Sequence, residues 1–278
     1  MKQKITMNNS SNKVVLITGG SSGIGKAVGI YLTKKGYKVY GTTRNKANYP
    51  NFDYFPLLEL NVTNTDTINK AIAELLIKEN KIDVLVNNAG IGITGPVEEI
   101  PDNEIIKHFE TNYFGAIKTM KGVLPQMRKQ KSGLIINVTS IAGHMGLPFR
   151  GIYSASKAAL EITTEAIRME TKSFGIKITN LAPGDFATNI AGGRFHAPLI
   201  KNSAYEKGYQ TTLNLINEHV DSGDDPSMVG LVVEKIINTK NPKIHYKVGA
   251  LLQKFSVTLK RILPDKTFEK MLLNHYKL

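Results

Sequence analysis

A short and almost wholly apolar run leads straight into a glycine-rich turn and then into a segment with helical spacing. The run is Val14 to Thr18, the turn is T-G-G-S-S-G-I-G at Thr18 to Gly25, and the helical spacing covers Ile24 to Lys35. A strand this apolar suits a sheet that is buried on both faces. Glycines let the backbone bend tightly between the strand and the helix. The arrangement therefore predicts the first strand, turn and helix of an α/β fold.

The same alternation continues along the chain. The other short β-rich runs are Lys38 to Thr43, Val84 to Asn87, Leu134 to Val138 and Ile176 to Leu181. The longer segments with helical spacing are Asp66 to Glu79, Asn103 to Lys129, Ile152 to Phe174, Ala204 to His219 and Ser227 to Asn238. Alternating strands and helices build parallel sheets that are covered on both faces. We therefore predict a single-domain α/β Rossmann fold, with a doubly wound parallel sheet and a helical C-terminal extension.

The chain divides into three predicted parts. Residues 1–12 are polar and form an expected flexible N-terminus. Residues 13–246 carry the alternating pattern of the α/β domain, and residues 247–278 form a helical extension of that domain. A length of 278 residues suits a single α/β unit of this kind.

The composition excludes several kinds of chemistry. The chain has no cysteine, so it forms no disulfide and uses no thiolate. Its six histidines lack the spacing of metal ligands, and we predict no metal site. No apolar window has the length of a transmembrane span or the form of a signal peptide. We expect a cytoplasmic protein.

The formal net charge of +13 favours anionic partners such as nucleotide cofactors, nucleic acids or membrane surfaces. The simpler interpretation is a solvated, lysine-rich surface, because the lysines are spread along the chain. Nucleic-acid binding would require a clustered basic face with interleaved aromatic residues. The sequence shows no such cluster, and we predict no nucleic-acid partner.

The turn from Thr18 to Gly25 is a candidate phosphate site. Free N–H groups and the positive dipole at a helix N-terminus attract anions, and glycines let the backbone approach them closely. Three residues separate Gly19 from Gly23, so the turn is a variant of the common G-x-G-x-x-G pattern. An ordinary strand-to-helix turn is the alternative. The position between a buried strand and a helix favours dinucleotide binding.

The end of the second strand indicates which dinucleotide binds. A cofactor without a 2′-phosphate usually meets a carboxylate there, on the adenosine ribose. This sequence has Thr42-Thr43-Arg44 instead. The planar guanidinium of Arg44 can pair with a phosphate. We therefore predict that NADP(H) is preferred over NAD(H); the alternative is a surface arginine without a ligand.

Several motifs between Lys13 and Asn189 resemble, in the right order, those of the short-chain dehydrogenase/reductase family. The glycine turn is similar to the family's T-G-x-x-x-G-x-G. The other matches are N-N-A-G at Asn87 to Gly90, T-N-Y-F-G around Asn112, T-S-I-A-G around Ser140, Y-S-A-S-K from Tyr153 to Lys157, and P-G at Pro183-Gly184 with Thr188 beyond it. Their ordered coincidence is what carries the resemblance.

The resemblance implies two sets of site residues. The catalytic set is Asn112, Ser140, Tyr153 and Lys157. The cofactor set, with Arg44 added from the reasoning above, is Thr18, Gly19, Ser21, Ser22, Gly23, Ile24, Gly25, Arg44, Asn61, Val62, Asn88, Ala89, Gly90, Tyr153, Lys157, Pro183, Gly184 and Thr188. The pair Asn61-Val62 departs from the family's D-V pair, which contacts adenine, because asparagine carries no charge.

Tyr153 and Lys157 are the predicted centre of the chemistry. A four-residue spacing places both on one face of a helix, a turn apart. Hydride transfer to a carbonyl leaves charge on its oxygen, which needs an acid within reach. A nearby cation favours the phenolate form of a tyrosine. The resemblance assigns Ser140 to the substrate oxygen, Lys157 to the nicotinamide ribose and Asn112 to a water relay; taken alone, such a tyrosine–lysine pair is more often surface packing.

The stretch from Ser140 to Lys157 is similar to the hydroxysteroid and retinol dehydrogenase subgroup. The resemblance implies an apolar alcohol or carbonyl substrate and the use of NADP(H). We therefore predict an oxidoreductase that interconverts a ketone or aldehyde and an alcohol. The alternatives are a non-catalytic, cofactor-binding regulatory protein and a membrane-surface protein on the same fold.

Other segments suggest how a substrate would be held. Met145, Leu147, Phe149 and Phe186 line an apolar pocket or belong to the core, and the sequence does not separate these alternatives. Ala191 to Ser203, with Phe195, is rich in glycine and polar residues and is a predicted mobile lid. His144 is expected to be a solvated loop histidine and receives no catalytic role.

The tail from Lys247 to Leu278 is amphipathic and basic, as helices at membrane surfaces can be. We favour packing over the substrate site or against another subunit, and association with a membrane is the less favoured alternative. The family resemblance implies a homodimer or homotetramer, formed through the helices at 103–129 and 152–174.

Overall fold

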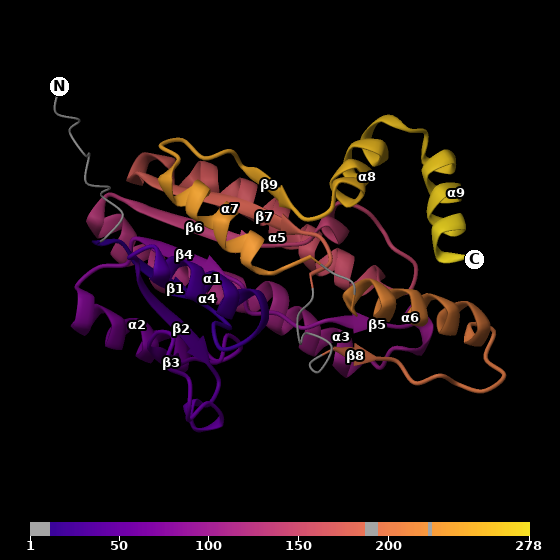
Figure 1. Cartoon of the computed structure of the whole chain (residues 1–278), viewed down its shortest axis with the longest axis horizontal. Helices are drawn as coiled ribbons and strands as arrows, with labels where there is room; N and C mark the ends of the chain where they lie inside the picture. Colours follow the sequence, from indigo (N-terminus) through magenta and orange to yellow (C-terminus); the bar gives the residue numbers. More distant parts are fainter. Residues whose placement is uncertain (1–11, 187–193, 222–223) are drawn as a thin grey trace.

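The computed structural model describes residues 12–186, 194–221 and 224–278 (Figure 1). Nearly all of the expected flexible N-terminus, the site residue Thr188 and the first part of the predicted lid lie outside these residues. The described chain forms a central sheet with helices on both faces, and two C-terminal helices project beyond one end of the sheet. Within the same residues, every helix is too short or too polar to span a lipid bilayer.

Seven strands form the main sheet, in the order β3-β2-β1-β4-β6-β7-β9. All neighbouring strands are parallel. The predicted doubly wound Rossmann fold is therefore confirmed. The order reverses between β1 and β4, and in such sheets a ligand crevice lies at the carboxyl ends of the strands at this point. The strands are β1 Val14–Ile17, β2 Lys38–Thr43, β3 Leu57–Glu59, β4 Val84–Asn87, β6 Gly133–Val138, β7 Ile176–Pro183 and β9 His245–Val248.

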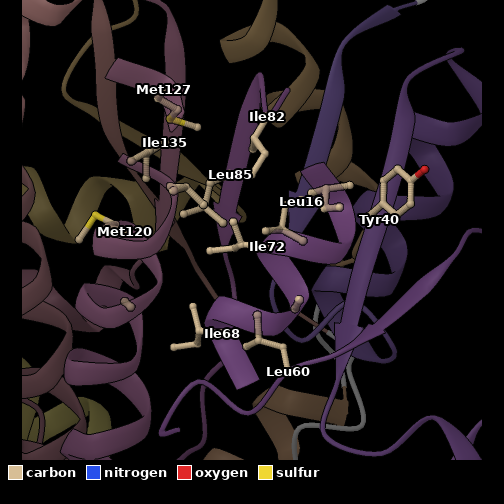
Figure 2. Close-up of a cluster of buried hydrophobic side chains, with 14 of the residues drawn as sticks. Leu16, Tyr40, Leu60, Ile68, Ile72, Ile82, Leu85, Met120, Met127 and Ile135 are labelled. Carbon is tan, nitrogen blue, oxygen red and sulfur yellow. The ribbon is translucent and has the colours of Figure 1, made fainter. Parts of the chain in front are cut away.

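Two apolar layers hold the helices against the sheet. Alternate residues of β1 enter opposite layers, because successive side chains of a strand point to opposite faces. One layer joins the sheet to α2 (Thr65–Glu79), α4 (Gly115–Gln130) and α5 (Gly151–Glu170), and Figure 2 shows its buried side chains around Leu16, Ile72 and Leu85. The other layer joins the sheet to α1 (Gly23–Lys34) and α7 (Ser227–Asn238).

The long helix expected at 103–129 is interrupted. The chain forms α3 (Asp102–Phe109), one π-turn (Glu110–Phe114) and then α4. A π-turn inserts an extra residue into a helix and is frequent at functional sites. Its place here coincides with Asn112, whose side chain bonds the backbone beyond β4.

Several short elements carry no clear sequence signal. The strands β3 and β9 add one edge each to the main sheet, and a separate sheet pairs β5 (Ile93–Thr94) with β8 (Phe195–His196). The predicted lid is thus corrected in part, because Phe195 lies in a paired strand and not in an irregular loop. β9 runs to Val248, two residues past the expected domain boundary at 246.

The C-terminal extension packs on the body of the domain beside the end of β6. The helices α8 (Leu251–Ile262) and α9 (Asp265–Tyr276) bury Val257 and Phe268 against Ile141, Met145 and other apolar residues. The helix α6 (Glu206–Asp221) lies near α9. The tail therefore covers part of the domain, and its packing against another subunit stays a prediction.

Candidate active site

Hydrogen bonds join the end of β1 to the end of β4 at the crevice. The hydroxyl of Thr18 accepts from the backbone N–H groups of Asn88 and Ala89, at 2.9 and 3.0 Å. The amide Nδ2 of Asn88 donates back to the carbonyl oxygens of Thr18 and Gly19, at 3.0 and 3.3 Å. These bonds fix the glycine turn relative to the neighbouring strand.

The backbone of the turn has the form that a phosphate site requires. Gly19 and Gly23 have φ angles of 64° and 51°, which favour glycine. A Cβ on Gly25 would collide with the carbonyl oxygen of Gly19. The side chain of Ser22 forms no cap hydrogen bond at the start of α1 within the described chain. The first N–H groups of α1, beside Ser21 and Ser22, are thus placed to bind a phosphate.

The residues expected at the adenosine end lie on neighbouring strand ends. Arg44 follows β2 directly and is exposed. The backbone N–H of Leu60 donates to the carbonyl of Thr43 at 2.8 Å, which brings Asn61 beside that end. The side-chain Oδ1 of Asn61 accepts from the backbone N–H and hydroxyl of Thr63, at 3.2 and 3.0 Å. The Asn61 side chain thus accepts hydrogen bonds that an aspartate could also accept. The side chain of Val62 is buried and packs beside the start of α4.

Ser140, Tyr153 and Lys157 line one pocket together with Ile24, Asn88 and Gly90. Ser140 follows β6, and its hydroxyl accepts from the N–H of Ala142 at 3.1 Å. Lys157 is 5% exposed, donates to the carbonyl of Val138 at 3.0 Å and has its Nζ 5.9 Å from the ring centre of Tyr153. Three of the four residues of the expected catalytic set therefore share a pocket with Ile24 of the glycine turn.

Asn112 lies behind this pocket. Its Oδ1 accepts from the N–H of Ile91 at 2.8 Å, and its Nδ2 donates to the carbonyl of Ile91 at 2.9 Å. Gly90 separates it from Lys157, since a Cβ there would lie 3.3 Å from Asn112 Oδ1 and 3.6 Å from Lys157 Nζ. Among the described residues, the side chain of Asn112 does not bond Lys157. It fixes the backbone beyond β4, and a relay through a water stays a prediction.

His108 is a neighbour of the site that the sequence interpretation missed. Its Nε2 lies 3.1 Å from Asn112 Nδ2 and 3.0 Å from the hydroxyl of Ser156, and its ring centre is 5.9 Å from that of Tyr153. Burial, with a smaller effect from Lys157, lowers the pKa of His108 to about 4. A neutral imidazole can accept at Nε2 from Asn112. The sequence signal that could have identified His108 is its four-residue spacing from Asn112, which places both on one helical face.

His144 is not the solvated loop histidine that was expected. Its Nδ1 pairs with the buried carboxylate of Glu161 at 3.0 Å. The other carboxylate oxygen of Glu161 accepts from the hydroxyl of Thr139 at 2.8 Å. Glu161 belongs to α5, so this pair holds the turn that carries Ser140 against the helix that carries Tyr153.

A second and larger cavity, of about 540 Å³, opens beside Ser140. Met145 and Leu147 line it, and Phe186 lines the smaller pocket. Phe149 packs instead against Tyr209 in a core cluster. Met145 and Phe186 also belong to buried core clusters, so pocket and core do not exclude each other for these two residues. Pro183 lines the smaller pocket, and Gly184 lines both.

Comparisons with known proteins agree with this geometry. A family profile described as short chain dehydrogenase matches residues 13–198. A crystal structure of a short-chain dehydrogenase from Streptomyces avermitilis is 30% identical and superposes with a TM-score of 0.81, covering 96% of this chain and 97% of that one.

Two curated relatives are similar over nearly their whole length. The 3-ketodihydrosphingosine reductase of Bacteroides thetaiotaomicron is 37% identical, over 95% of this chain and 98% of its own. The NADPH-dependent 3-dehydrocapnine reductase of Ornithobacterium rhinotracheale is 29% identical, over 95% of this chain and 98% of its own.

The close contact at Gly25 yields a test of the turn. We expect Gly25→Ala to lower the free energy of unfolding by about 1–3 kcal/mol, since the added Cβ meets backbone that must shift. The same shift should weaken NADPH binding. Urea denaturation and a fluorescence titration measure the two effects. Gly146→Ala is the control, because its Cβ would meet nothing within 4 Å; equal behaviour of both variants would contradict the description of the turn.

The buried His108 yields a pH-dependent test. The unfolded chain binds a proton at this histidine below about pH 6.5, whereas the lowered pKa of about 4 keeps the folded form neutral. The free energy of unfolding should therefore fall as the pH falls from 6.5 to 4, by up to about 3 kcal/mol from this group. His108→Gln should flatten this dependence. An unchanged slope in the His108 variant would contradict the assignment.

Proposed function

This chain belongs to the short-chain dehydrogenase family, and we propose that it is an NADP(H)-dependent reductase that converts the carbonyl of an apolar substrate to an alcohol. The chain is an oxidoreductase by its family. The observation that carries the finer proposal is the shared pocket, in which Ser140, Tyr153 and Lys157 lie beside residues of the glycine turn and of the β4 end.

In the proposed reaction, Tyr153 donates its hydroxyl proton to the substrate oxygen. A nicotinamide cofactor held by the glycine turn and the β4 end would supply the hydride for this reduction. The ammonium of Lys157 stabilises the phenolate that remains on Tyr153. The hydroxyl of Ser140 already accepts from Ala142, so its own proton is available to bond the substrate oxygen as charge develops there.

The cavity beside Ser140 supports a long, apolar substrate. A volume of about 540 Å³ falls in the range of roughly 300–1,000 Å³ that small-molecule sites occupy. Side chains of α8 and α9, such as Leu259, Phe268 and Leu272, supply much of the lining. The relative from Bacteroides thetaiotaomicron is named for the reduction of a ketone, 3-ketodihydrosphingosine. We propose the reductive direction and a long-chain ketone for this chain as well.

The proposed preference for NADP(H) is supported at the end of β2. The sequence there is Thr42-Thr43-Arg44, without a carboxylate for the ribose hydroxyls. Arg44 is exposed and can pair with a 2′-phosphate. The 3-dehydrocapnine reductase is named as NADPH-dependent.

The alternative functions have less support. A non-catalytic regulatory protein would be favoured by a damaged catalytic set, and all four residues are present here. Membrane association finds some support in Leu251, Leu252 and Phe255 of α8, which are 80%, 83% and 53% exposed. It stays a prediction, as do the cytoplasmic location and the homo-oligomer.

The role of Tyr153 is tested by Tyr153→Phe. Losing the proton donor should reduce kcat by about a hundredfold or more, while the Kd of NADPH stays within about twofold of the wild type, because only a hydroxyl is removed. NADPH oxidation with a long-chain ketone and a fluorescence titration measure the two. Tyr31→Phe, which removes a hydroxyl bonded to Glu234, is the control. Retained turnover in Tyr153→Phe would refute the mechanism.

The role of Arg44 is tested by Arg44→Gln. Losing one charge-assisted contact to a phosphate should raise the KM of NADPH by about tenfold. The KM of NADH should not change, since NADH lacks that phosphate. Steady-state kinetics with both cofactors measure the difference, with the exposed Arg128→Gln as the control. A higher kcat/KM of the wild type with NADH would overturn the proposed preference.

A further inference from the structure

Two arginines lie where the smaller pocket meets the larger cavity. Arg150 lines both spaces, and Arg194 lines the smaller one beside Tyr153 and Ser140. The roles proposed above use neither side chain. The larger cavity is mostly apolar, so two cations beside the reacting group require a chemical explanation.

Arg150 is positioned by the start of α5. It directly precedes this helix and lies three residues before Tyr153. Its guanidinium carbon is 5.2 Å from the ring centre of Tyr153, and it lines the larger cavity together with Tyr276 of α9. The guanidinium therefore stands between the proposed proton donor and the helices that line the apolar cavity.

Arg194 approaches the same point from another segment. Its side chain packs over Gly92, where a Cβ would lie 2.7 Å from Arg194 Cγ and 2.8 Å from Arg194 Nε. Glycine at position 92 thus makes room for the arginine. Burial, and then the positive charge of Arg150, lower the pKa of Arg194. The two guanidinium groups are close enough to repel each other.

Two carboxylates, those of Asp185 and Asp224, line the larger cavity with Arg150. Asp185 lines both spaces and is the nearby carboxylate that acts on Arg194. Its Oδ2 accepts instead from the amide of Gln253 at 2.8 Å. Among the described residues, neither arginine forms an ion pair. An anion between them would relieve their repulsion and form charge-assisted hydrogen bonds with their planar donors.

We propose that Arg150 and Arg194 form a subsite for an anionic group, and that the substrate is an amphiphile with this group near its carbonyl and an apolar chain in the larger cavity. The anionic group is of the carboxylate, phosphate or sulfonate class. The proposal rests on the proposed reductase function, because it places the carbonyl beside Tyr153. A phosphate of the cofactor offers the same chemistry, so the test separates the two sources.

The test measures binding and does not depend on turnover. Dodecyl phosphate and dodecanol, below their aggregation limits, are titrated calorimetrically into the enzyme saturated with NADP⁺. We expect dodecyl phosphate to bind about tenfold or more tightly than dodecanol, because it gains charge-assisted hydrogen bonds. Arg194→Gln and Arg150→Gln should remove this difference, and Arg194→Lys should keep part of it. Arg128→Gln, which removes the charge of an exposed residue of α4, should keep all of it.

The outcomes separate this proposal from its competitors. Equal binding of the two probes to the wild type would overturn it. If Arg194→Gln weakens NADPH binding and leaves dodecyl phosphate binding unchanged, the arginine serves the cofactor and the proposal is wrong. The comparison of the two probes is made on the wild type and needs no turnover. A failure of the proposed tyrosine mechanism therefore does not alter this result.

Discussion

Every strand of the main sheet runs in the same direction, so the carboxyl ends of its strands meet at one edge. The turn after β1, the N-N-A-G segment after β4, Ser140 after β6 and Pro183 at the end of β7 all lie there. Ile24 and Pro183, which are 159 positions apart in the sequence, thereby line one pocket. A parallel sheet needs its crossover helices for this arrangement, and one of them, α5, brings Tyr153 and Lys157 to the same edge.

Buried polar bonds then fix the strand ends relative to one another. Thr18 and Asn88 join β1 to β4, and the amide of Asn87 donates to that of Asn137 at 2.9 Å, which joins β4 to β6. Lys157 ties α5 to the carbonyl of Val138. Each such group would be costly to bury without its partner. The site is thus held by the interior of the protein as well as by its loops.

The sequence predicted those parts of the site that lie within short motifs. The glycine turn, Ser140, Tyr153 and Lys157 each stand in a local pattern, and the structure brings them together. The strand β9, with H-Y-K-V, carries no clean pattern because it lies at the sheet edge and pairs only with β7. The meeting of Arg150 with Arg194 depends on tertiary packing over Gly92, which no local spacing encodes. The four-residue spacing of His108 and Asn112 indicates that they lie on one helical face. The hydrogen bond from Asn112 to His108 becomes part of the site only because both side chains are buried.

The π-turn at Glu110–Phe114 makes this part of the chain intolerant of changes in length. Removing one residue there would restore an ordinary helix, and each residue of an α-helix accounts for about 100° of rotation. The apolar face of α4, with Met120 and Val123, would then turn away from the sheet, or α3 would turn with His108. Related chains should therefore vary in length at their surface loops and keep a constant residue count between α3 and α4.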